Sequence, residues 1–153
     1  MLLVLSIMFP NNEMLWHKRQ QYGDKAWVFL LLKPDILWEC DCAFYPTNAA
    51  SAGLRHEPVE NFKTADAFES MFAREVIKET TTNGVDPITR SPDLKRFLPT
   101  DVQAEVLVFN TITPNYIIKC LHHSGLNMDL LIKRYPNITF SSITEQHRFY
   151  GFR

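Results

Sequence analysis

Short apolar runs limit what this chain can fold into. The two longest, Leu2–Met8 and Ala26–Leu32, are each bounded by turn-forming residues such as Pro, Asn and Gly. They are far shorter than the roughly 20 apolar residues that a membrane-spanning helix requires, and they are typical of strands. We expect both runs to be strands covered on both faces, and we expect no membrane span.

A helical pattern follows Thr64, where apolar residues recur at intervals of three and four. The pattern predicts a helix with Thr64 as its N-cap. Its apolar face comprises Ala65, Phe68, Met71, Phe72 and Val76, and it ends at Thr80–Gly84. Strands and helices in this order favour an α+β fold, with a mixed β-sheet core and flanking helices, in a single domain that spans residues 1–153.

Composition excludes several classes of protein. Sixteen Lys and Arg against 17 Asp and Glu give a net charge of −1, so any nucleic-acid site must be local. The spacings of His and Cys match no metal motif, and no glycine-rich phosphate loop occurs. We therefore expect no metal. The three cysteines, Cys40, Cys42 and Cys120, are expected to be reduced, buried thiols of a cytoplasmic protein.

The run Gln103–Val108 places a single carboxylate, Glu105, in a β-prone segment. Side chains alternate along a strand, so Glu105 and Leu107 would share one face. Glu105 is then either a structural residue, exposed or paired with an Arg, or an acid held at a strand end to act on a substrate. The preceding segment, Pro87–Pro99, is expected to be irregular and charged. It is either simply solvated or in contact with a polyanion.

The segment Gln103–Val108, followed by Ile112–Ile117, resembles the signature of the DarT family of DNA ADP-ribosyltransferases. Three further segments resemble the family in the same order: Phe9–Trp16, Tyr45–Ser51 and Leu131–Pro136. The resemblance implies an ADP-ribosyltransferase-like fold. The family's N-terminal His-x-Thr segment has no counterpart ahead of Leu2, so we expect an N-terminally shortened member.

The resemblance also implies a chemistry for these residues. Glu105 would be the catalytic acid of an NAD-dependent transfer of ADP-ribose to thymine or guanine in single-stranded DNA, with Gln103 beside the base. The other residues implied to bind substrate are Asn48 and Met14, in the nucleotide pocket, and Arg90, Lys95 and Arg96, at backbone phosphates. The expected biological role is that of a toxin paired with a macrodomain antitoxin. The alternative is an inactive remnant, or a module that binds nucleic acid or a partner without catalysis.

Overall fold

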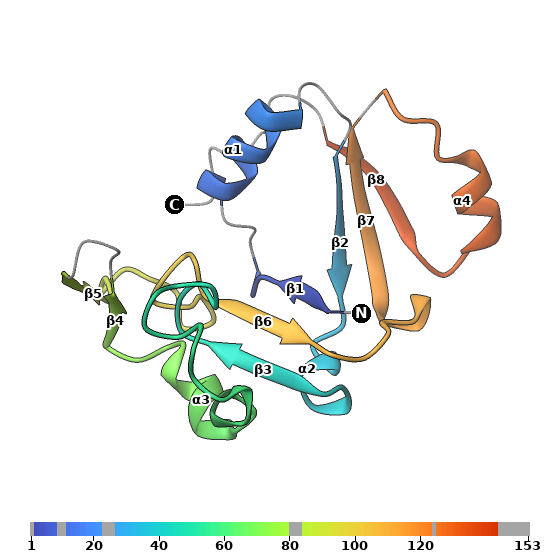
Figure 1. Cartoon of the computed structure of the whole chain (residues 1–153). Coiled ribbons are helices and arrows are strands. Elements are labelled where there is room, and N and C mark those ends of the chain that lie inside the picture. Colours follow the sequence, from blue (N-terminus) through green and yellow to red (C-terminus); the bar gives the residue numbers. More distant parts are fainter. Residues whose placement is uncertain (1, 9–11, 23–26, 80–83, 124, 144–153) are drawn as a thin grey trace. The chain divides into compact units, whose positions relative to one another are not determined.

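The computed structural model of the chain describes residues 2–8, 12–22, 27–79, 84–123 and 125–143 (Figure 1). The chain divides into two compact units, Met1–Asn11 with Cys40–Asn110 and Asn12–Glu39 with Thr111–Arg153. Both units combine helices with strands, which confirms the predicted α+β class. The strands within the described residues form three small sheets. That residues 1–153 make up a single domain stays a prediction.

A three-stranded antiparallel sheet forms the centre of the first unit (Figure 1). Its strands are β1 (Leu3–Leu5), β6 (Glu105–Val108) and β3 (Cys42–Tyr45), with β6 in the middle. Strand β3 is buried throughout, and β6 is buried except at its first residue. The prediction that Leu2–Met8 is covered on both faces is wrong, because both Leu2 and Val4 are exposed.

The two faces of β6 pack against different parts of the first unit. Glu105 pairs with Tyr45 and Leu107 with Ala43, and residues directly opposite in an antiparallel pair share a face. Leu107, Ala43 and Tyr45 form a buried cluster on this face, covered by the four partly buried residues Ala49, Leu54, Val59 and Phe62. The last two belong to the 3-10 helix η1 (Val59–Phe62). The predicted alternation along this strand is confirmed.

The opposite face of the sheet packs on helix α3 (Ala65–Ser70). The ring of Phe44, on β3, meets the ring of Phe68 edge to face, with 5.2 Å between their centroids. The predicted N-cap is confirmed, because the Thr64 hydroxyl accepts a hydrogen bond from the Ala67 amide at 3.1 Å. The helix is six residues long, so most of its stability must come from this packing.

The predicted extension of that helix to Val76 is wrong. Residues beyond Ser70 turn into a β-hairpin of β4 (Glu75–Glu79) and β5 (Val85–Thr89), in which Val76 pairs with Ile88. A spacing of four placed Val76 in the helical pattern, but the β-branched pair Val76-Ile77, one buried and one exposed, suits a strand. Residues 80–83 lie outside the described residues. Pro87 lies in β5, so the irregular segment starts only after Thr89.

The second unit contains a mixed three-stranded sheet. Its order is β2-β7-β8, with β2 antiparallel and β8 parallel to the central strand. Val28, Leu30 and Leu31 are exposed, so the prediction that Ala26–Leu32 is buried on both faces is wrong. The described elements of this unit are α1 (Asn12–Tyr22), β2 (Val28–Leu32), α2 (Ile36–Glu39), the 3-10 helix η2 (Pro114–Tyr116), β7 (Ile117–His123), α4 (Asp129–Arg134) and β8 (Thr139–Ile143).

All three cysteines carry free thiols. Cys42 and Cys120 are buried as predicted, whereas Cys40 is only partly buried. Burial, with the neighbouring Cys40 and Asp41 adding to it, raises the pKa of Cys42 to about 11. Its thiol is therefore protonated at neutral pH and a poor nucleophile. Within the described ranges, no helix is both long and apolar enough to cross a membrane.

The central position of β6 generates a prediction. Val106 is fully buried, so Val106→Asp places an unpaired carboxylate in the core and should cost about 4 kcal/mol or more of unfolding free energy. Urea denaturation followed by circular dichroism measures the loss. The matched control is Val85→Asp on β5, where the side chain is largely exposed and the loss of unfolding free energy should be about 0.5 kcal/mol. Equal losses would contradict the central role of β6.

Candidate active site

Glu105 lies at the point where a buried strand begins. It is the first residue of β6, and its partner Tyr45 is the last residue of β3. The loop that follows Tyr45 and the turn that precedes Glu105 therefore meet at the same end of the sheet. Glu105 is half-buried, while the rest of β6 is buried.

The loop after β3 supplies two hydrogen-bond donors to this carboxylate. The Ala49 amide donates to Oε2 of Glu105 at 3.0 Å, and the side-chain amide of Asn48 donates to Oε1 at 3.4 Å. Asn48 also shapes the loop, because its Oδ1 accepts from the Ala50 amide at 2.8 Å. This is the local bond by which Asn stabilises turns. The small residues of the loop thus let its backbone approach a carboxylate, and the structure brings Asn48 and Glu105 together.

The surroundings of Glu105 raise its proton affinity. Burial raises the pKa of the Glu105 carboxyl, the hydrogen bond from the Ala49 amide opposes this, and the charge of Asp101 adds to it. The apolar side of the site consists of Tyr45, whose ring stacks on Phe62 with 4.1 Å between centroids. A carboxylate in such surroundings is suited to stabilise a nearby positive charge and to accept a proton.

A buried bond between Thr47 and Asp101, absent from the sequence-based predictions, connects the two segments that meet at Glu105. The Thr47 hydroxyl donates to Oδ2 of Asp101 at 2.6 Å, and both residues are almost fully buried. The other oxygen, Oδ1, accepts from the Gln103 amide at 2.9 Å. An Asp that accepts from the amide two residues on is a common turn signal, which could have marked Asp101 in the sequence.

Gln103 occupies this turn and is not part of β6, so the strand expected in the run Gln103–Val108 begins only at Glu105. The backbone bond to Asp101 begins a turn that ends the irregular segment before β6. The side chain of Gln103 reaches the neighbouring hairpin, where its Oε1 accepts from the Lys78 ammonium at 3.0 Å.

The three predicted phosphate contacts have different surroundings. Arg90 is partly buried, and its guanidinium donates to the carbonyls of Leu98 and Lys95, each at 2.8 Å, and to the Thr100 hydroxyl at 3.1 Å. These bonds hold the irregular segment in shape. Lys95 and Arg96 are exposed on that segment. A contact of any of the three with phosphate stays a prediction.

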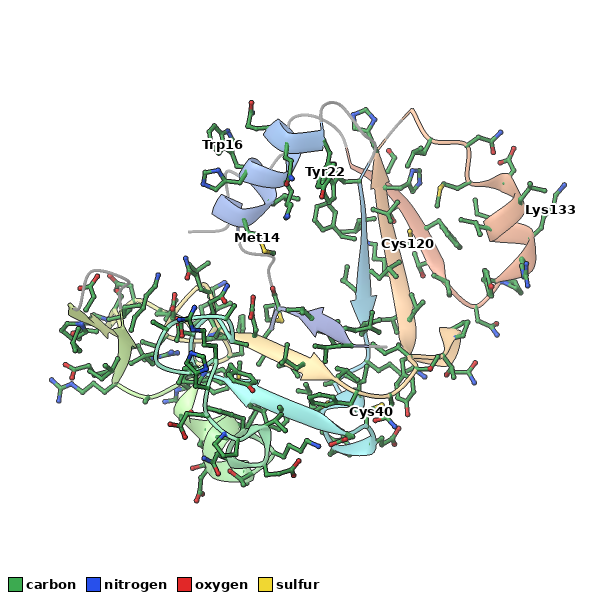
Figure 2. The ribbon with its side chains drawn as sticks, viewed as in Figure 1. Met14, Trp16, Tyr22, Cys40, Cys120 and Lys133 are labelled. Carbon is green, nitrogen blue, oxygen red and sulfur yellow. The ribbon has the colours of Figure 1, made fainter. Side chains whose placement is uncertain are left out.

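Met14 lies on α1 in the second unit, where it projects from the helix together with Trp16 (Figure 2). Both side chains are exposed. The role of Met14 in a nucleotide pocket therefore stays a prediction. The part of the chain that the structure describes contains no group of three or more His, Cys, Asp or Glu side chains that could hold a metal ion.

Comparison with models of protein families identifies a match. The family model described as "ssDNA thymidine ADP-ribosyltransferase, DarT" matches residues 7–141, which is most of the chain. The matched region includes Asn48, the irregular segment after β5 and Glu105. A search among curated proteins found no match.

The buried bond between Thr47 and Asp101 should stabilise the site. Thr47→Val keeps the shape of the side chain but leaves a buried carboxylate oxygen without its donor, which should cost about 1–3 kcal/mol of unfolding free energy. Urea denaturation measures this cost. A double-mutant cycle supplies the control: in an Asp101→Ala background the same change should cost at least about 1 kcal/mol less. Additive losses would contradict the importance of the bond.

The raised pKa of Glu105 predicts a pH dependence of stability. Between its ordinary pKa and the raised folded-state pKa, the native state holds more protons than the unfolded state, so stability falls as pH rises. Glu105→Gln removes this effect. The unfolding free energy of the variant minus that of the wild type should therefore increase from pH 4 upward, through the ordinary pKa of about 4.3, and level off above the folded-state pKa. A difference that stays constant with pH contradicts the expectation.

Proposed function

The chain belongs to the DarT family, whose members are ADP-ribosyltransferases that act on single-stranded DNA, and we propose that it transfers ADP-ribose from NAD to thymine in single-stranded DNA. The family is described as modifying thymidine, which supports thymine as the acceptor. Enzymes of this class use NAD as the donor of ADP-ribose.

The geometry of Glu105 carries the proposal. A carboxylate has about four acceptor positions, and the loop donors Asn48 and Ala49 occupy one on each oxygen. The remaining positions are available to the hydroxyls of a ribose. Two fixed donors, one of them a backbone amide, keep the carboxylate in one orientation before substrate arrives, which is the condition for electrostatic catalysis.

Glu105 has two parts in the proposed reaction. The bond between the ribose C1′ and nicotinamide breaks, and nicotinamide leaves with the electron pair. Positive charge develops at C1′, and the Glu105 carboxylate stabilises it. A nitrogen of the base then attacks C1′, and the proton that this nitrogen loses passes to Glu105. The raised pKa of Glu105 favours this proton transfer.

The other predicted site residues are assigned to binding. Gln103 lies two residues before Glu105 and is proposed to contact the base, which must be unstacked for its nitrogen to be reached. Lys95 and Arg96, both exposed, are proposed to attract the phosphates, a local contact that fits a net charge of −1. Arg90 is proposed to contact the phosphates and Asn48 to line the nucleotide pocket, whereas a nucleotide contact by Met14, on α1 of the second unit, stays a prediction from the resemblance.

The biological setting is also a proposal. An enzyme that modifies bases in single-stranded DNA harms the cell that contains it unless the modification is reversed. We propose that this chain is the toxin of a toxin–antitoxin pair in the cytoplasm, and that a macrodomain protein is the antitoxin. The resemblance of the Tyr45–Ser51 and Gln103–Val108 segments to DarT supports this assignment.

Incubation with NAD and a mixed-sequence single-stranded oligonucleotide tests the function, with mass spectrometry as the readout. The wild type should add ADP-ribose to the oligonucleotide. Glu105→Gln should lower the rate roughly 100-fold or more, because charge stabilisation and proton transfer are both lost. The matched control is Glu69→Gln, an exposed position on α3, which should leave the rate unchanged.

Two outcomes contradict the proposal. An undiminished rate in Glu105→Gln shows that the carboxylate does not take part in the chemistry. Binding of the oligonucleotide by the wild type without any adduct supports the alternative, a binding module without catalysis.

A further inference from the structure

Lys78 is an inward-facing lysine with a specific acceptor. It lies two residues after the buried Val76 on β4, and residues two apart on a strand share a face. Its ammonium is therefore directed toward the inner side of the hairpin. There it donates to Oε1 of Gln103 at 3.0 Å, and both residues are partly buried.

This bond decides which end of the Gln103 amide is available to a ligand. An ammonium group has three donors and no acceptor, so it can bond only to the oxygen of the amide. The Gln103 backbone is held at the same time, because its amide donates to Oδ1 of Asp101. With backbone and side-chain oxygen both held, the NH2 group of Gln103 is the end that remains for hydrogen bonding.

We propose that Lys78 is a positioning residue that makes Gln103 a hydrogen-bond donor toward the base, so that the site selects bases with a carbonyl oxygen at that edge. This inference rests on the proposed function, which places Gln103 beside the base. Thymine carries O4 where cytosine, of nearly the same shape, carries an amino group. The NH2 group of Gln103 can donate a hydrogen bond to O4 of thymine. Opposite the amino group of cytosine, two donors would face each other.

The neighbouring charged residues of the hairpin cannot take over the role of Lys78. Asp86 lies directly across from Lys78 in the β4–β5 register, and as an acceptor it cannot orient the Gln103 oxygen. Arg74, just before β4, is an exposed cation near the same strand. It offers a matched control for the loss of positive charge.

The experiment measures the Kd of two single-stranded oligonucleotides that differ only in a central thymine or cytosine. All proteins carry Glu105→Gln and are saturated with NAD, so that no base is modified during the measurement. With Lys78 present, thymine should be preferred by about fivefold or more, the lower end of the cost of an unsatisfied polar group. Lys78→Glu presents an acceptor to Gln103, turns the amide around and should lower or reverse this ratio.

Two further variants separate orientation from charge. Lys78→Arg, which also has only donors, should preserve the preference for thymine. Arg74→Glu makes the same change in charge as Lys78→Glu and should weaken the binding of both oligonucleotides equally. If Lys78→Glu leaves the ratio of the two Kd values unchanged, or weakens the binding of both oligonucleotides equally, the inference is overturned while the proposed function stays intact.

The proposed function fails in a different way. If none of these proteins binds either oligonucleotide, and the protein with Glu105 forms no adduct, both the function and the inference are overturned. If the protein with Glu105 forms adducts and the ratio does not depend on Lys78, only the inference is overturned.

Discussion

The antiparallel pairing of β3 with β6 is the constraint on which the site depends. It places the end of one buried strand beside the start of the other, with Tyr45 opposite Glu105. The loop and the turn that leave these strands must then meet, and the bond between Thr47 and Asp101 closes them together. The donors of the loop, Asn48 and the Ala49 amide, then give the carboxylate at the start of β6 a defined orientation.

Sequence patterns predicted the centre of this arrangement well. Alternation along Gln103–Val108 placed Glu105 and Leu107 on one face. The helix that begins after Thr64 was also predicted, since its N-cap is a local bond. These features depend on residues close together in the chain, which is why periodicity and capping rules reach them.

The features that were missed depend on contacts between distant segments. Val76 fits a helical spacing, and only its pairing with Ile88 across the hairpin makes it part of a strand. The bonds of Thr47 to Asp101 and of Lys78 to Gln103 join residues 54 and 25 positions apart. The exposure of Leu2 and Val4 likewise depends on which segments cover the sheet, which an apolar run cannot reveal.

The bond from the Ala49 amide to Glu105 has a consequence for how this site tolerates mutation. The donor is a backbone group, so every residue except proline at position 49 retains it. Genetic drift at that position can alter side-chain volume but cannot delete the donor. The sensitivity of these hydrogen bonds to substitution is thereby concentrated in Glu105 and in Asn48, whose side chains take part in them, whereas position 49 contributes its donor through the backbone.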